Sequence, residues 1–320
     1  MKRIFEYKDY TDDELFFEEK LNNYGIEIHA GTVANPEGKG NEDAFSIILK
    51  DNCLWIGVFD GTTSLKSIPS LNDQTGARFA SHRLKELFIN VLQKMEVTPK
   101  DLLLELNSLL FLESKKIGGA LSDTHSLPAS MATIVTVDFS NKSLKFAHIG
   151  DTYGFVFKSN NSSQLFTDDK NNKFDQEMFS ILKEISRDKS ITVRQARQDA
   201  DFKKSLYEMF IRRNNNPNRL GSGLLNGDPH AELYIQEGHL SLQDVAGLII
   251  ATDGLEIQGK NIIDEVTRDE IYKIIKREGL RKFINIKKDS EDADPEWNYV
   301  RYKHSDDATG VVVWFVDSLP

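Results

Sequence analysis

The sequence predicts an α+β fold in which two antiparallel β-sheets pack on each other and helices lie outside them. Segments with strand periodicity follow one another in groups, whereas a parallel α/β fold would alternate them strictly with helices. Two long segments, 73–95 and 99–116, repeat apolar residues every three or four positions. Such spacing predicts amphipathic helices that cover a core.

The composition is that of an ordinary globular protein. The chain has 320 residues, 39% of them hydrophobic and 28% charged, with a net charge of −10. This negative charge argues against nucleic-acid binding, which needs a basic face. The single cysteine, Cys53, excludes an internal disulfide framework and a thiolate metal site.

The beginning of the chain interleaves charges with aromatic residues and lacks the apolar stretch of a signal peptide. No apolar run reaches the length of a membrane span. We therefore expect a cytoplasmic protein with neither a membrane nor a nucleic acid as partner.

Before residue 130 the elements can be assigned in order. Residues 1–24 have no clean period and suggest an arm or a short helix. Strands are predicted at 25–31, 44–49 and 54–59, and the last of these is apolar on both faces and therefore central. The two amphipathic helices follow.

From residue 130 the apolar period changes to two. The segments 130–139, 144–149 and 153–158 predict a three-stranded meander, and 174–213 has a helical, strongly charged pattern. The remaining expectations are a hairpin at 231–242, a strand at 247–252, a helix at 268–278, an acidic loop at 289–297 and a strand at 309–316.

Acidic residues stand at the ends of four predicted strands. Asp60 and Asp253 each follow an apolar run, Asp306 precedes another, and Glu42 with Asp43 precedes a fourth. A buried strand cannot hold a carboxylate in its middle without a partner, so these groups lie at strand ends, where several strands can converge on one site. Each aspartate alone could equally be a turn residue, since Asp-Gly is a common turn dipeptide.

Carboxylates with no histidine or cysteine in their motifs are hard oxygen ligands, which suit Mg²⁺ or Mn²⁺ better than Zn²⁺ or Cu²⁺. Two such cations can activate a water and neutralise charge on a transferring phosphoryl group. The residues therefore favour phosphate ester hydrolysis.

A phosphatase of the haloacid dehalogenase type is excluded. The segment VFDGT ends as that family's D-x-D-G-T motif does, but Val58 occupies the position of the nucleophilic aspartate. No phosphoaspartate can form without that carboxylate, and the predicted antiparallel strands disagree with that family's parallel sheet.

Six motifs, in order, resemble those of the metal-dependent serine/threonine protein phosphatases of type 2C (the PPM family). The family patterns are N/M-E-D-A, V-x-D-G, G-S-T-A, G-D-S, S-D-G-L and D-N/D-x-T/S. The matching segments are NEDA (41–44), VFDG (58–61), SMAT (130–133), IGDT (149–152), ATDGL (251–255) and DDAT (306–309). The ordered set is far more specific than any one motif, and it implies that family's αββα sandwich.

The resemblance implies a catalytic metal site. Asp60 would bridge two Mn²⁺ or Mg²⁺ ions, with the carbonyl oxygen of Gly61 on one ion and Asp253 and Asp306 on the other. A bridging water would attack phosphorus directly, so no covalent enzyme intermediate is expected. Asp151, in the strand break, is interpreted as a structural turn residue.

Other positions follow from the same resemblance. Glu42 and Asp43 would hold metal-bound waters. Where the family usually has a phosphate-binding arginine, four residues before Glu42, this chain has Gly38, and we expect the neighbouring Lys39 to bind phosphate instead. Thr62 stands where eukaryotic members have a histidine that acts as general acid. That acid contributes only about 10²- to 10⁴-fold of up to roughly 10²¹-fold, so Thr62 is compatible with activity.

The resemblance spans nearly the whole chain and implies one catalytic domain, 1–320, with a helical insertion or flap at about 166–229. Between residues 183 and 219 ten basic residues stand against five acidic ones. This excess suggests either a lid that selects acidic phosphoprotein substrates or a solvated helix face. The expected function is hydrolysis of phosphoserine and phosphothreonine on proteins, opposite a serine/threonine kinase pathway. The alternative is a non-catalytic regulatory or scaffolding module of the same fold.

Overall fold

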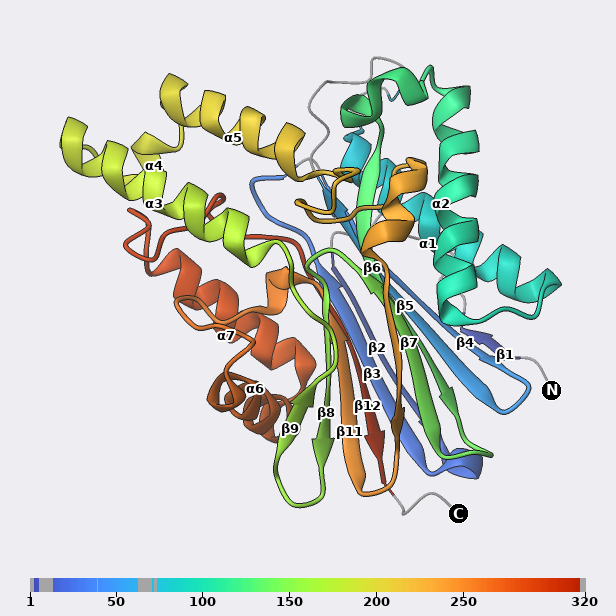
Figure 1. Cartoon of the computed structure of the whole chain (residues 1–320). Coiled ribbons are helices and arrows are strands. Elements are labelled where there is room, and N and C mark those ends of the chain that lie inside the picture. The colour runs from blue at the N-terminus through green and yellow to red at the C-terminus, as the bar shows by residue number, and fades with distance from the viewer. Residues whose placement is uncertain (1–2, 6–13, 39, 63–70, 72–73, 317–320) are drawn as a thin grey trace.

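The computed structural model describes residues 3–5, 14–38, 40–62, 71 and 74–316. Within these ranges, two six-stranded antiparallel sheets pack face to face (Figure 1). The first has the order β1 (Arg3–Phe5), β4 (Asp43–Lys50), β5 (Cys53–Thr62), β6 (Ala129–Asp138), β7 (Ser143–Ile149) and β10 (Gln236–Ser241). The second has the order β2 (Glu14–Leu21), β3 (Ile26–Val33), β12 (Ala308–Phe315), β11 (Val245–Ala251), β8 (Tyr153–Lys158) and β9 (Ser163–Leu165).

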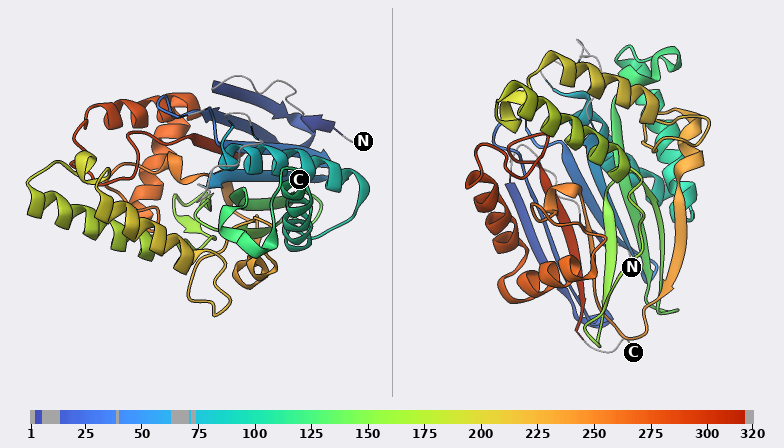
Figure 2. Two further views of the ribbon diagram at one scale, coloured as in Figure 1. Left: turned by 90° about the horizontal axis from the view of Figure 1, so that it is seen from above. Right: turned by 60° about the vertical axis from the view of Figure 1, so that its left-hand side comes forward.

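Helix pairs cover the outer face of each sheet. Helices α1 (Gly76–Lys94) and α2 (Pro99–Lys116) pack on the first sheet, and α6 (Glu265–Glu278) and α7 (Leu280–Asp292) pack on the second. The two pairs lie on opposite sides of the sheets (Figure 2). The predicted α+β sandwich is therefore confirmed.

Strand β5 shows how one apolar run serves two cores. Leu54, Ile56 and Val58 point into the core between the sheets. Trp55 and Phe59 point the other way, into the core beneath α1 and α2. Alternation along the pleat thus buries both faces, which places β5 near the middle of its sheet.

The two helices on the first sheet begin at capping residues that the sequence supplies. Thr75 accepts a hydrogen bond from the backbone N–H of Arg78 and caps α1. Thr98 and Asp101 form a reciprocal capping box at the start of α2, with Pro99 in the first turn. These caps fix both helix starts, and the predicted helix 99–116 is confirmed at both ends.

The predicted meander is wrong in its third strand. Strand β6 pairs with β7, but β8 pairs with β11 and β9 in the second sheet. The change of sheet occurs at Gly150, whose φ of +101° few side chains tolerate. The chain crosses from one sheet to the other at this glycine, beside Asp151.

Two further sequence assignments are wrong. Residues 229–234 form a 3₁₀ helix, not a strand, because Pro229 donates no backbone hydrogen bond and Asp228 caps the turn; β10 then pairs with β7. The expected N-terminal arm or short helix is an edge strand, β2, over Glu14–Leu21, paired with β3. The exposure along β2 is that of a strand with one solvent-exposed face.

The acidic segment 289–297 is partly helical, since α7 continues to Asp292. A buried ion pair of 2.8 Å between Lys287 and Glu291 joins successive turns of that helix. The turn that follows is organised by Asp294, which accepts hydrogen bonds from the backbone N–H groups of Asn298 and Tyr299. Its 2.7 Å ion pair with Arg301 completes the turn.

The helical segment 174–213 contains three helices, α3 (Asn172–Lys189), α4 (Val193–Ala196) and α5 (Ala200–Arg213). Ser190, with φ of +51°, ends α3, and Thr192 and Asp199 cap the next two helices. These helices extend beyond the sandwich and have a core of their own (Figure 1). Among the described residues, no helix is both long and apolar enough to span a membrane.

We predict that Gly150→Ala lowers the free energy of unfolding by about 2 to 4 kcal/mol, measured by urea denaturation. A Cβ there would be strained by the positive φ and would also overlap the Met131 side chain. The control is Gly118→Ala, where φ is +90° and no described atom lies within 4 Å of a Cβ. Gly118→Ala introduces backbone strain but no overlap. An equal loss of unfolding free energy in both variants would therefore contradict a contribution from the overlap with Met131.

Candidate functional site

Carboxylates from both sheets meet at one edge of the sandwich. Asp43 and Asp60 are direct cross-strand neighbours on β4 and β5. Asp253 begins the short helix η5 (Asp253–Leu255) directly after β11, and Asp306 lies two residues before β12. The strand ends that carried acidic residues in the sequence thus converge in space.

A buried hydrogen bond joins the two sheets at this edge. The Thr252 hydroxyl donates to the Asp43 carboxylate at 2.7 Å, and it accepts from the backbone N–H of Thr309 at 3.1 Å. The Thr252 N–H donates to the Thr309 carbonyl at 3.0 Å. Asp43 is only 4% exposed, so Thr252 supplies the hydrogen bond that its buried carboxylate requires.

Backbone hydrogen bonds fix the loops around Gly61. Asp307 accepts from the N–H of Asn35 at 2.7 Å and from that of Glu42 at 3.2 Å. Gly61 donates its N–H to the Glu42 carbonyl at 3.0 Å. A Cβ on Gly61 would stand 2.5 Å from that carbonyl oxygen and from the one of Ala77, so the close approach requires glycine.

The clustered carboxylates raise one another's pKa. Removal from water raises the pKa of Asp60 well above its usual range, and Asp43 and Asp253 add to the effect. Removal from water and the neighbouring Asp306 raise the pKa of Asp253 to about 7. The pKa of Asp43 is also raised, by burial and by Asp307. At neutral pH the cluster therefore holds negative charge at a cost.

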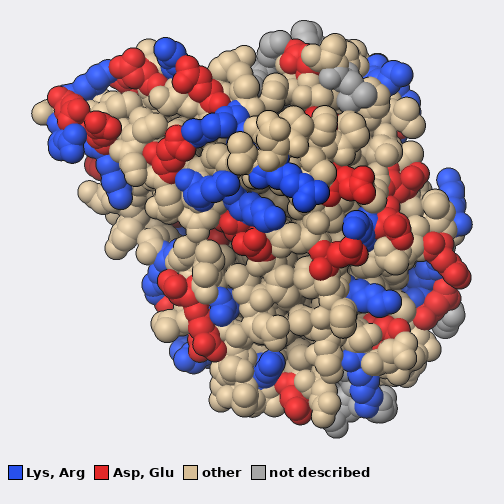
Figure 3. All heavy atoms as spheres, in the orientation of Figure 1, with Lys and Arg blue, Asp and Glu red and all other residues tan. Residues whose placement is uncertain are grey.

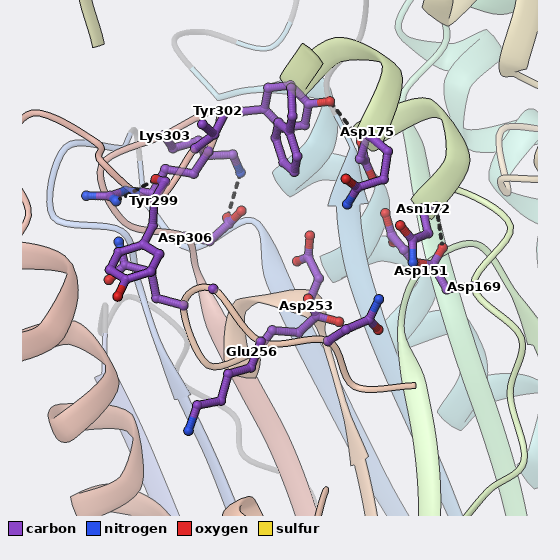
Figure 4. Close-up of a pocket in the computed structure, with 18 of the residues that line it drawn as sticks. Asp151, Asp169, Asn172, Asp175, Asp253, Glu256, Tyr299, Tyr302, Lys303 and Asp306 are labelled. Atoms are coloured by element: carbon purple, nitrogen blue, oxygen red, sulfur yellow. Dashed lines mark hydrogen bonds and ion pairs between the residues drawn. The ribbon is translucent and has the colours of Figure 1, made fainter. Parts of the chain in front are cut away.

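Among the described residues, Lys303 forms an ion pair with a carboxylate of this cluster. Its ammonium group donates to Asp306 at 2.6 Å. Burial alone would lower the pKa of Lys303, but Asp306, Asp253 and Asp60 outweigh it and raise that pKa. The lysine thus offsets part of the negative charge (Figure 4).

A second acidic group adjoins the first. Asp151 accepts from the Asn171 side chain at 2.7 Å, whereas its Oδ1 is buried without a hydrogen-bond partner among the described residues. Asp169 accepts from two N–H groups at the start of α3, and Asp175 accepts from the Tyr302 hydroxyl at 2.9 Å. Burial is the main cause that raises the pKa of Asp151 to about 7 and those of Asp169 and Asp175 to about 6.

Both groups line one cavity of about 790 Å³ (Figure 4). Its floor holds Asp60, Gly61, Asp253 and Asp306 from the strand ends. Its upper wall comes from the helices of the insertion, with apolar, aromatic and basic side chains that include Phe179, Met209, Phe210, Lys183, Arg197 and Arg213. The cavity is therefore acidic at the sandwich edge and partly basic beneath the insertion.

The donor atoms suit hard divalent cations. They are carboxylate oxygens with no thiolate or imidazole among them, which is the chemistry that Mg²⁺ and Mn²⁺ prefer. In the described part of the chain, no group of three or more His, Cys, Asp or Glu side chains could hold a metal ion as these side chains stand. The residues fit such ions because a cation would relieve the repulsion that raises their pKa values.

Not all residues that the sequence predicted for the site line the cavity. It brings Asp60, Gly61, Asp253 and Asp306 together around the cavity, with Asp43 buried behind them. Glu42 is present through its backbone, and its side chain is not part of the cavity wall. Lys39 lies outside the described residues. Their roles toward metal or phosphate stay predictions.

Asp151 is more than the structural turn residue that the sequence suggested, because its carboxyl group lines the cavity beside Asp253. Asp169, Asp175 and Glu256 were missed altogether. Two weak signals were available: Asp169 stands just before a helical pattern, and Glu256 directly follows the ATDGL motif. Nothing in the local sequence of Lys303 indicates that it reaches Asp306.

Comparison with protein-family models settles the relationship. The model described as Protein phosphatase 2C matches residues 30–284, which is most of the chain. The chain belongs to the protein phosphatase 2C family. The resemblance drawn from the six motifs is thereby confirmed. A search of curated proteins finds no significant match.

Solved structures of protein phosphatase 2C type share this fold. RsbX in complex with magnesium is 14% identical with a TM-score of 0.51, covering 94% of this chain and 99% of that one. A serine/threonine phosphatase of S. agalactiae is 13% identical with a TM-score of 0.54, over 90% and 99%. Stp1 from Staphylococcus aureus is 14% identical with a TM-score of 0.52, over 91% and 94%. At these identities the likeness shows the fold.

The raised pKa values predict how stability depends on pH. Between the ordinary aspartate pKa of about 3.9 and the folded value of about 7 for Asp253, the folded protein binds more protons than the unfolded chain. Without divalent cations, the free energy of unfolding should therefore fall as pH rises from 5 to 8. Asp253→Asn should flatten this slope in urea denaturation at several pH values. Asp188→Asn, at a carboxylate that is 56% exposed, is the control, and an equal effect there would contradict the assignment.

Proposed function

We propose that this protein phosphatase 2C chain hydrolyses phosphoserine and phosphothreonine on proteins with two bound Mn²⁺ or Mg²⁺ ions. The observation that carries the proposal is the convergence of Asp43, Asp60, Asp253 and Asp306 from both sheets, where burial and neighbouring carboxylates raise the pKa values of the first three. A purely structural site gains nothing from such repulsion, whereas a cation-binding site requires it. Family membership supports the same reaction class.

The chain's own residues would divide the work. Asp60, the Gly61 carbonyl, Asp253 and Asp306 would hold the ions, which when bound supply a Lewis acid and an acidified water. Asp43, whose carboxylate accepts a hydrogen bond from the Thr252 hydroxyl, would hold a metal-bound water. Glu42 would act in the same outer layer through a water.

The same proposal includes the other predictions made from the sequence. Lys39 would bind the substrate phosphate, and Thr62, which lines the cavity, leaves general-acid catalysis to water. Residues 1–320 would act as one catalytic domain in the cytoplasm, opposite a serine/threonine kinase. The insertion at about 166–229 would select the phosphoprotein from above the cavity. A non-catalytic module is the competing class, but the chain keeps every carboxylate of the matched motifs.

The proposal predicts metal-dependent release of phosphate from a phosphopeptide. Chelation with EDTA should abolish it, and Mn²⁺ should restore it. Asp60→Asn and Asp253→Asn should each lower kcat by at least about a hundredfold, since each removes a charged ligand where charge develops. The exposed-site variant Asp188→Asn should match the wild type. Full activity in either ligand variant would overturn the assignment.

Metal binding should also be visible without turnover. At about a hundred times its dissociation constant, Mn²⁺ should stabilise the fold by roughly 2.7 kcal/mol and raise the melting temperature in differential scanning calorimetry. Asp60→Asn should show a much smaller rise. It should also melt above the metal-free wild type, because a repelling charge is removed. A wild-type melting curve that Mn²⁺ leaves unchanged would count against a preformed site.

A further inference from the structure

The insertion places an unpaired guanidinium over the acidic cavity. Arg213 is the last residue of α5, is 5% exposed and lines the cavity wall. Its Nε donates to the Asn214 side chain at 2.9 Å, and its guanidinium stacks over the Phe210 ring at 4.9 Å. These contacts hold the side chain but leave Nη2, at the far end of the fork, buried without a hydrogen-bond partner among the described residues.

Half of the ten basic residues between 183 and 219 are already paired. Arg187, Lys189, Arg194, Lys204 and Arg212 each form an ion pair with a carboxylate. On the face shown in Figure 3, acidic and basic side chains are correspondingly interleaved over the insertion. These ion pairs involve half of the basic residues behind the local positive excess, and among the described residues Arg213 is not one of them.

Arg212 and Arg213 are neighbours with opposite situations. Arg212 is 51% exposed and bonds Glu177 at 2.6 Å. Arg213 faces inward, and among the described residues no carboxylate lies within 4.0 Å of its guanidinium, although Asp151 and Asp175 are near enough for its charge to lower their pKa values. Leaving such donors buried and unpaired is costly unless a ligand completes them.

The position of Arg213 is imposed by its surroundings. Its carbonyl accepts from the N–H of Ser222 at 2.9 Å, and a Cβ at Gly221 would overlap that same carbonyl. The turn after α5 is thus packed directly against the arginine backbone. A guanidinium held this rigidly is prepared for binding, since little rotational freedom is lost when it takes a partner.

We propose that Arg213 binds the phosphate group of the substrate, from the insertion side of the cavity. This inference rests on the proposed function. The two ends of a guanidinium can bond two oxygens of a phosphate dianion at once. The carboxylates of the cavity cannot bind an anion, so a positively charged donor is needed. At the position where the family's sequence pattern has an arginine, this chain has Gly38, and Arg213 would supply the guanidinium that Lys39 cannot provide.

The test compares Arg213→Gln, Arg213→Lys and the matched neighbour Arg212→Gln, all with Mn²⁺ present. Arg213→Gln should raise both KM and the inhibition constant of inorganic phosphate by roughly ten- to a hundredfold, the effect of losing hydrogen bonds between charged groups. The change should be equal for a phosphopeptide and a small aryl phosphate, because both present the same group. Arg212→Gln should change neither constant.

Arg213→Lys keeps the charge that faces Asp151 and Asp175, so it should fold even if the glutamine variant does not. It should weaken phosphate inhibition severalfold, since an ammonium group lacks the fork. Wild-type inhibition constants in either folded Arg213 variant would overturn the proposal and leave Arg213 as a structural cation. Lys39→Ala is measured alongside; if it alone raises the inhibition constant, Lys39 is the phosphate ligand and Arg213 is not.

The same experiment separates the two proposals. Absence of hydrolysis in the wild type would overturn the proposed function. Phosphate binding would then still be measured by calorimetric titration of the metal-loaded protein with inorganic phosphate. Normal hydrolysis with unchanged constants in the Arg213 variants would overturn only the inference about Arg213.

Discussion

The hydrogen bond from the Thr252 hydroxyl to Asp43 determines how this molecule can concentrate negative charge. It crosses between the two sheets, buries one carboxylate and fixes the strand ends on which the others stand. Because Thr252 is tied to Thr309 through the backbone as well, β4, β11 and β12 are locked together at that edge. Burial raises the pKa values of Asp43, Asp60 and Asp253, and because the strand ends are held in place, the repulsion among these carboxylates adds to the effect.

The cavity has an acidic floor, and basic side chains from the surrounding segments offset part of its negative charge. An acidic floor repels a phosphate dianion unless positive charge lies between them. Lys303 supplies some of that charge beside Asp306, and Arg213 supplies more from the opposite wall. Lys303 comes from the segment before β12 and Arg213 from the insertion, so the core fold and its added helices both contribute to the charge around the cavity.

The sequence predicted what depends on local pattern. The apolar run from Leu54 to Phe59 predicted the central strand, the apolar spacing of residues 99–116 predicted α2, and the acidic strand ends predicted that carboxylates would converge. It failed where partners are distant in sequence. Nothing in the period-two pattern of β8 says which sheet it joins, and that choice is made by Gly150. The contacts of Lys303 and Arg213 with the site likewise depend on how loops and the insertion pack, which no spacing encodes.

The order of strands along the chain also limits the order in which the two sheets can form during synthesis. Every strand of the first sheet has been synthesised once Ser241 is made, and its helices α1 and α2 come from the same portion of the chain. The second sheet cannot close until β12 (Ala308–Phe315) is inserted between β3 and β11. Domains tend to fold as synthesis proceeds, and pairing between distant segments is slow. The acidic edge is therefore completed last, when the closing strand brings Asp306 to residues translated more than two hundred positions earlier. A chain terminated before β12 would lack both Asp306 and the strand that joins β3 to β11.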